Sequence, residues 1–177
     1  MPQLHREHGA RRREEDEMIK GLHHSVYRCR NSQETRSFYE DFLGLRFVSA
    51  FEIADPRGLH TFFEMEDGSF LAFFEVPGLP FEFKNQNLLD LHIALRVEPE
   101  TFDHMLRQGQ AEGREVRGPV DHGFVRSLYL RDPNGYVVEL TAATSMHDDT
   151  MDPAIAKPHE ALARWQKLGE SGSSGMP

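Results

Sequence analysis

Cysteine, long apolar runs and positive charge are all scarce in this chain of 177 residues. Its one cysteine, Cys29, excludes an internal disulfide and fits a reducing, cytoplasmic setting. No apolar run approaches the roughly 20 residues that a membrane span requires, and the charged N-terminus predicts no secretory signal. The formal net charge of −9 argues against a general nucleic-acid binder, which would carry a basic face. We therefore expect a protein that binds neither nucleic acid nor a membrane.

An internal repeat organises the chain, over about residues 21–78 and 89–143. Each half reads as a strand, a helix and three further strands. The first strands match directly, with His24-Ser-Val-Tyr-Arg-Cys in one half and His92-Ile-Ala-Leu-Arg-Val in the other. The predicted fold class is therefore α+β, with two pseudo-symmetric βαβββ modules that form a cup-shaped, half-open β-barrel around a metal site.

The ends of the chain and two local signals complete the outline. Residues 1–20 predict a mobile charged arm, and residues 144–177 predict a linker, a short helix at about 158–168 and a mobile tail. Asn31 has the position of a helix N-cap, with Glu34 placed to reach back as in a capping box. The run Asp132-Pro133-Asn134-Gly135 predicts a tight turn between two strands.

The strand after that turn contains one carboxylate, Glu139, between two apolar residues. A lone acid in a buried strand is costly unless it is paired or binds a metal. Because side chains alternate across a strand, His24, His92 and Glu139 would line one cup if the two modules pack as half-barrels. Two imidazoles and one carboxylate leave coordination positions open, which suits Fe(II); Mn(II), Ni(II) and Zn(II) accept the same ligands. The repeat register favours His24 over His23, because Arg28 then matches Arg96.

Several other polar residues lie outside this three-residue pattern. Glu75 lies about fifty residues after His24, as Glu139 does after His92, and is open to three interpretations: a fourth ligand, a pocket base, or a partner of Arg28 or Arg96. We expect both arginines to form internal ion pairs rather than to bind a substrate anion. Core positions are expected for Cys29 and for most of the aromatic residues between 70 and 83. The remaining histidines of the folded part are expected at the surface: His60, His104, His147 and His159.

Residues 21–143 resemble the vicinal oxygen chelate superfamily, which includes glyoxalase I, fosfomycin-resistance proteins and extradiol ring-cleavage dioxygenases. The resemblance rests on the two histidine-bearing strands and on the helix that ends Phe-Tyr-Glu-Asp-Phe-Leu-Gly-Leu. It implies that His24, His92 and Glu139 are metal ligands. The stretch from His122 through Leu128-Tyr129, Asp132-Pro133 and Gly135 to Glu139 further resembles the extradiol signature. That signature implies that His122 and Tyr129 lie beside the substrate and hydrogen-bond its oxygens.

The function implied by this resemblance is a non-haem Fe(II)-dependent dioxygenase. It would cleave a catecholic or related small aromatic substrate with O₂, in the catabolism of aromatic compounds, and would be a homodimer. One departure is that residues 68–73 contain no histidine, where extradiol enzymes carry an acid/base; His122 is the candidate to replace it. Two alternatives stay open: a glyoxalase-like lyase or isomerase without redox chemistry, which would use Glu75 as fourth ligand and base, and a drug-binding protein.

Overall fold

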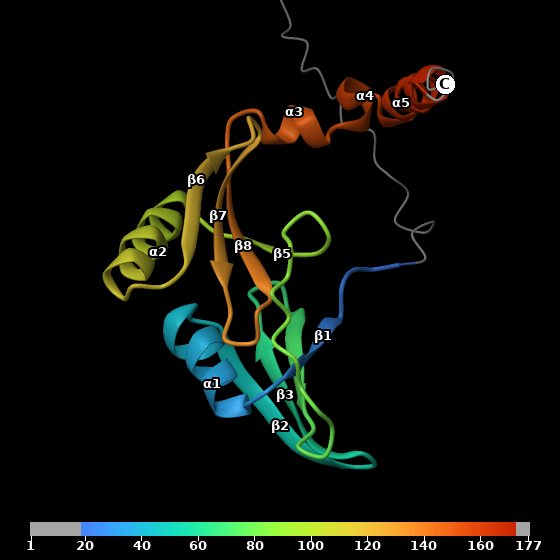
Figure 1. The fold of residues 1–177 in the computed structure, drawn as a ribbon. Coiled ribbons are helices and arrows are strands. Elements are labelled where there is room, and N and C mark those ends of the chain that lie inside the picture. The colour runs from blue at the N-terminus through green and yellow to red at the C-terminus, as the bar shows by residue number, and fades with distance from the viewer. Residues whose placement is uncertain (1–18, 173–177) are drawn as a thin grey trace, which may run out of the picture.

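The computed structural model describes residues 19–172, with side chains as far as residue 167, and shows two modules of the same order (Figure 1). The first module consists of β1 (His24–Cys29), α1 (Ser32–Arg36), the π-helix η1 (Ser37–Phe42), β2 (Arg46–Ala54), β3 (Arg57–Glu64) and β4 (Phe70–Glu75). The second consists of β5 (Ile93–Arg96), α2 (Pro99–Ala111), β6 (Val116–Asp121), β7 (Val125–Arg131) and β8 (Val137–Ala143). The order of elements therefore repeats as the sequence predicts.

Each module forms its own four-stranded mixed sheet. The strand order is β1-β4-β3-β2 in the first sheet and β5-β8-β7-β6 in the second. The pairs β1–β4 and β5–β8 are parallel, and the other neighbours are antiparallel. The sheets lie one below the other and do not close (Figure 1). The predicted α+β class, with two βαβββ modules in a half-open arrangement, is confirmed.

One face of each sheet packs against the helices and forms a shared core. Alternation along β4 sends Leu71 and Phe73 into this core, and alternation along β8 does the same for Val138 and Leu140. Core residues also come from the helices of both modules: Phe38, Tyr39, Phe42, Phe102 and Met105. We call the opposite side of each sheet its open face. His24 and Glu139 both belong to open faces.

The first helix begins at the predicted N-cap. Asn31 Oδ1 accepts hydrogen bonds from the backbone N–H groups of Gln33 and Glu34, at 2.8 and 3.0 Å. The expected return contact of the capping box is replaced, because the Glu34 carboxylate instead accepts from the Arg30 guanidinium at 2.5 Å. The helical segment ends before Gly44, whose φ of +79° is the left-handed conformation that glycine adopts without strain.

The Asp132–Gly135 turn ties the second module to the first. Asn134 Oδ1 accepts from the backbone N–H of Arg30 at 2.9 Å, and Asn134 Nδ2 donates to Thr35 Oγ1 at 3.2 Å. Asp132 Oδ2 accepts from the Tyr39 hydroxyl at 3.2 Å. Burial raises the pKa of the Asp132 carboxyl, and the surrounding donors partly oppose that rise. The turn that the sequence predicts is thus also the main polar link between the modules.

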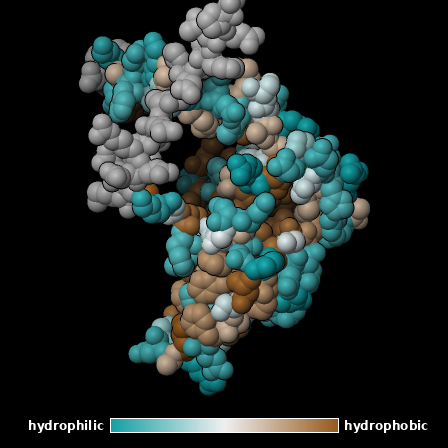
Figure 2. Space-filling view, turned by 180° about the vertical axis from the view of Figure 1, so that it is seen from behind, coloured by the Kyte–Doolittle hydropathy of each residue, from teal (hydrophilic) through white to brown (hydrophobic). Residues whose placement is uncertain are grey.

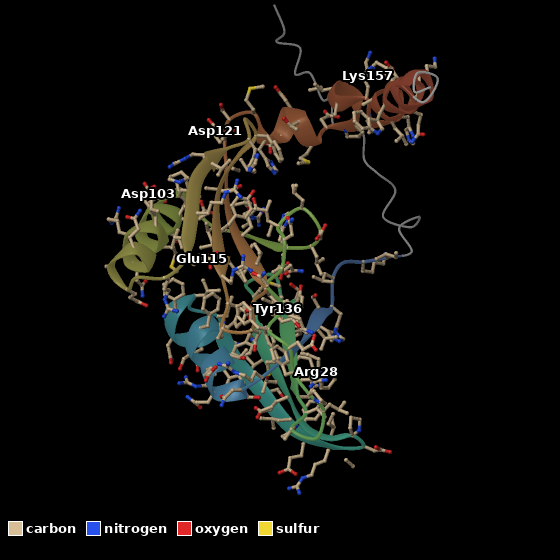
Figure 3. All side chains as sticks on the ribbon, viewed as in Figure 1. Arg28, Asp103, Glu115, Asp121, Tyr136 and Lys157 are labelled. Atoms are coloured by element: carbon tan, nitrogen blue, oxygen red, sulfur yellow. The ribbon has the colours of Figure 1, made fainter. Side chains whose placement is uncertain are left out.

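Three helices follow the second sheet: α3 (His147–Met151), α4 (Pro153–Ala156) and α5 (Pro158–Gly172). They extend away from the sheets, and Lys157 marks the junction of α4 and α5 (Figures 1 and 3). The expected linker is therefore partly helical, and the expected helix at 158–168 continues to residue 172. The arm predicted at the start of the chain falls almost wholly on residues 1–18, outside the described residues. None of the described helices is long and apolar enough to cross a membrane.

Candidate functional site

The strand register shows which positions of the two modules correspond. In the second module Ala94 is the neighbour of Glu139, two residues after His92. In the first module Val26 is the neighbour of Ala72, two residues after His24. Ala72 therefore occupies the place of Glu139, and the first sheet offers no carboxylate at that point.

Glu75 lies three residues beyond Ala72 and on the opposite side of the sheet. Its Cα partner on β1 is Cys29, which is buried in the core as predicted. The Glu75 carboxylate accepts a hydrogen bond of 2.6 Å from the backbone N–H of Ser32, in the first turn of α1. A carboxylate in this position stabilises the helix N-terminus. This contact gives Glu75 a structural role that the sequence did not predict, and it lies on the opposite side of the sheet from the His24 face.

His92 and Glu139 do meet, on the open face of the second sheet. Their Nε2 and Oε2 atoms are 2.8 Å apart, and Glu139 is only 5% exposed. His92 Nδ1 lies 2.5 Å from the carbonyl oxygen of Leu88, so it carries the proton and donates. In the neutral ring Nε2 then turns its lone pair toward the carboxylate. Two such electron donors face each other stably only around a proton or a cation.

The spacing of this pair fits a bound divalent metal. Ligand atoms at about 2.1 Å from a metal, at right angles to each other, lie about 3 Å apart. The Nε2–Oε2 distance of 2.8 Å is close to that value. The contact of His92 Nδ1 with a backbone carbonyl is also the kind of outer contact that orients metal-binding histidines. His92 and Glu139 are therefore suited to hold two adjacent coordination positions.

Tyr129 and His122 stand beside this pair. Tyr129 on β7 is the cross-strand neighbour of Glu139, and its ring meets the His92 ring edge-on at 6.1 Å. The His122 Nε2 atom lies 2.9 Å from the Tyr129 hydroxyl. Burial, followed by the nearby Glu139 carboxylate, raises the pKa of Tyr129, so the phenol stays protonated and can donate. Four of the five expected site residues thus form one cluster.

His24 is the expected site residue that stands apart. Its Nδ1 atom lies 2.8 Å from Nδ1 of His23, and its ring lies 5.9 Å from that of Phe62. Between residues 19 and 167, no three His, Cys, Asp or Glu side chains converge in a way that could hold a metal. The expected three-residue site is thus not assembled within one chain, because the two sheets lie one below the other rather than face to face (Figure 1).

The expected ion pairs of the two arginines are not found in the described part of the chain. Arg28 donates from Nη2 to the carbonyl oxygen of Leu79 at 3.3 Å, and its buried Nε has no partner there. Arg28 lies low on β1, near Tyr136 of the other module (Figure 3). Arg96 is exposed at the end of β5. The prediction of internal ion pairs is thus not confirmed for these residues in the described part of the chain.

His60 was expected at the surface, and this expectation is wrong. The side chain is only 9% exposed and stacks on Phe74, with ring centroids 3.8 Å apart. Its Nε2 is buried and has no partner among the described residues. Alternation along β3, which puts His60 on the same face as Phe62, was the sequence signal that pointed to this position. Of the others, His104 and His159 are exposed and His147 is partly buried.

A pocket of about 650 Å³ opens at the far end of the first sheet. Residues from the β2–β3 turn and from the segment after β4 line it, among them Glu52, Arg57 and Leu79. Glu75 borders it, but His24, His92, Glu139, His122 and Tyr129 do not. We therefore place the candidate chemistry at His92 and Glu139, where a buried donor pair exists, and not at this pocket.

Comparison with known proteins identifies the family of this chain. Residues 21–140 match the family described as Glyoxalase/Bleomycin resistance protein/Dioxygenase superfamily. A lactoylglutathione lyase of Neisseria meningitidis is 26% identical over 131 residues, covering 72% of this chain and 94% of that protein.

Solved structures share the fold. A glyoxalase/dioxygenase from Nostoc punctiforme superposes with a TM-score of 0.59 at 22% identity, covering 71% of this chain and 92% of that one. The fosfomycin resistance protein FosX of Listeria monocytogenes, in complex with Mn(II) and 1S,2S-dihydroxypropylphosphonic acid, superposes with a TM-score of 0.58 at 20% identity, covering 74% and 98%. With two βαβββ modules, a His–Glu pair on an open sheet face and a family match over most of its length, this chain belongs to the Glyoxalase/Bleomycin resistance protein/Dioxygenase superfamily.

Proposed function

We propose that this protein is a metal-dependent, glyoxalase-like lyase or isomerase that acts on a small molecule without redox chemistry. The observation that carries the proposal is the buried contact of His92 Nε2 with Glu139 Oε2. The named relatives add support, since they include a lactoylglutathione lyase and a fosfomycin resistance protein with Mn(II). This proposal replaces the dioxygenase as our first interpretation and uses Mn(II), Ni(II) or Zn(II) rather than Fe(II).

Each residue of the cluster has a chemical role in this proposal. A divalent metal would supply a Lewis acid that polarises the oxygens of the substrate. His92 and Glu139 would hold it, and Leu88 keeps the His92 ring in the required orientation. Tyr129 donates a hydrogen bond to a substrate oxygen. His122 exchanges the proton of that phenol with solvent, since it is exposed and within 2.9 Å of the hydroxyl.

A second copy of the chain would supply His24. Among the described residues of one chain, His24 does not form a metal-binding group with His92 and Glu139. Its side chain belongs to the open face of the first sheet. In a symmetric dimer, the first sheet of each copy could face the second sheet of the other copy through their open faces. His24 of one copy would then meet His92 and Glu139 of the other, and the dimer would contain two such sites. This proposal keeps His24 as a ligand and requires the homodimer expected from the sequence.

The test is metal-dependent turnover in the absence of oxygen. The purified chain is loaded separately with Mn(II), Ni(II), Zn(II) and Fe(II) under nitrogen and desalted, and bound metal is measured. Each form is then assayed with lactoylglutathione, with fosfomycin and with catechol, with and without O₂. We expect turnover that depends on a bound metal and is unchanged by O₂. Turnover that requires both Fe(II) and O₂ would overturn the proposal.

The extradiol dioxygenase stays as a second candidate because of one specific contact. His122 and Tyr129, the two residues that the extradiol signature places beside the substrate, are in hydrogen-bond contact next to Glu139. In that case the same assay would show O₂ uptake on catechol by the Fe(II) form. The pair Phe70 and Ala72, on the open face of β4, offers no replacement for the missing acid/base histidine, so His122 would have to serve.

A further inference from the structure

In the described part of the chain, the buried side-chain polar atoms without a partner all lie on the open faces of the two sheets. Among the described residues, the buried side-chain nitrogen and oxygen atoms without a hydrogen-bond partner are Arg28 Nε, His60 Nε2 and Ser127 Oγ. Arg28 shares a face with His24, and the register joins it through Phe74 to His60. Ser127 shares a face with Tyr129 and Glu139. Buried polar groups are normally paired, so these faces have hydrogen-bonding capacity that a ligand would satisfy.

An aromatic wall surrounds His60 on the first of these faces. It consists of Phe51, His60, Phe62, Phe70 and Phe74. His60 lies parallel to Phe74 at 3.8 Å and 4.3 Å from the ring of Phe62, while Phe51 meets it edge-on at 5.2 Å. Hydrophobic side chains gather over this lower half of the molecule in the view from behind (Figure 2). The side chains of the wall are thus apolar except for the imidazole of His60, whose Nε2 is buried without a partner among the described residues.

The wall begins next to the proposed metal ligand of the first module. The His24 ring is 5.9 Å from that of Phe62, which in turn is 4.3 Å from that of His60. A substrate whose oxygens lie near His24 would therefore extend its remaining atoms along Phe62 toward His60. Phe51 lies at the outer edge of the wall and is 48% exposed. If its side chain moves aside, a flat ligand ring can occupy its position next to the His60 imidazole.

We propose that His60 is a specificity-determining residue that hydrogen-bonds, through Nε2, the oxygen of an uncharged planar aromatic group lying on this wall. The inference rests on the proposed function for the position of the metal end of the substrate. Burial, and then the neighbouring His24, lowers the pKa of His60, so the ring is neutral near pH 7 and matches a neutral partner. An apolar wall discriminates weakly between similar rings, whereas a buried hydrogen-bonding group rejects a ligand that lacks the matching oxygen.

The experiment compares 2-naphthol with naphthalene, which differ by one hydroxyl. Binding of each to the full-length protein is measured by ligand fluorescence, with and without Mn(II). His60→Phe keeps a planar ring and removes both nitrogens, and His104→Phe makes the same change at an exposed position of α2. We expect His60→Phe to weaken 2-naphthol binding about five- to tenfold and to leave naphthalene binding unchanged. His104→Phe should behave as wild type.

A third variant guards against a folding defect. His60→Gln keeps an amide N–H near the Nε2 position, so it should retain most of the preference for 2-naphthol. The inference is overturned if wild type binds neither compound, or if His60→Phe binds 2-naphthol as wild type does. The binding of 2-naphthol without Mn(II) tests the role of His60 independently of the metal. Failure of the proposed function would instead appear as a protein that binds no metal but still prefers 2-naphthol.

Discussion

Glu139 is the residue on which the candidate chemistry depends. Its carboxylate is buried beside His92 Nε2, and no arginine or lysine pairs with it among the described residues. A buried carboxylate without such a cation is costly, and a bound metal removes the cost. The proposed metal site rests on this buried contact of Glu139 with His92.

The first prediction concerns this carboxylate. Glu139→Gln keeps the shape of the side chain and removes the charge, so we expect bound Mn(II) to fall below detection after desalting. Glu115→Gln is the matched control, since Glu115 is an exposed acid that pairs with Arg131 at the surface. Metal content per chain, measured by elemental analysis, is the readout. Wild-type metal content in the Glu139 variant would contradict the assignment.

The second prediction uses the lowered pKa of His60. The folded pKa lies below the unfolded value of about 6.5, so the unfolded chain takes up this proton first as the pH falls. The contribution is fully present above about pH 6.5 and is lost on acidification toward the folded pKa, by at most about 1.4 kcal/mol per pH unit. Burial is the larger cause of this lowered pKa, and the nearby His24 is the second. Urea unfolding from pH 8 to 5.5 should show a shallower decline for His60→Phe than for wild type.

At the scale of elements, the Asp132–Gly135 turn does more than connect β7 and β8. Asn134 reaches across to Arg30 and Thr35, and Asp132 reaches Tyr39, so one turn fixes the second sheet against the first helix. A side chain at position 135 would be excluded, because a Cβ there would lie 2.7 Å from the backbone nitrogens of Lys84 and Asn85. The turn is therefore built into the interface between the modules.

The third prediction tests that link. Asn134→Ala removes the acceptor of the Arg30 N–H and the donor to Thr35, and we expect a loss of about 1–3 kcal/mol in the free energy of unfolding. Asn87→Ala is the control, because its side chain only accepts from Leu89 in an exposed loop, and should change stability by less than about 0.5 kcal/mol. Chemical denaturation measures both. Equal losses in the two variants would show that the turn is not a special link.

At the scale of the whole molecule, the open faces of the two sheets are the surfaces on which we propose that a second copy of the chain binds. Each open face carries buried polar atoms without partners and part of the expected ligand set. The exposed apolar side chains of α5, with Leu162 and with Trp165 at 71% exposure, also lie apart from the described core. The proposed dimer, which pairs unlike open faces, would complete the ligand set without any change in the chain.

The fourth prediction separates a shared site from a site within one chain. His24→Ala and Glu139→Gln, each expressed alone, should bind no metal. Co-expressed in equal amounts they form mixed dimers in which one of the two sites is intact, so about a quarter of all sites should bind Mn(II). Metal analysis of the co-purified protein gives the answer. No recovery in verified mixed dimers would exclude a site shared between two copies, and metal retained by His24→Ala alone would place His24 outside the metal site.

The sequence by itself determined the repeat, the order of elements, the Asp132–Gly135 turn and the resemblance that names His92 and Glu139. Periodicity and turn chemistry are local, so they can be read without contacts between distant residues. The tertiary structure decided the rest. Glu75 resembled Glu139 in spacing, but the register put Ala72 in that place, because three residues along a strand reverse the face. We expected His60 at the surface, but its neighbours on β2 and β4 are Phe51 and Phe74, and their rings bury it. The meeting of His92 with Glu139, and the separation of His24 from both, depend on how the two sheets pack, which no local pattern encodes.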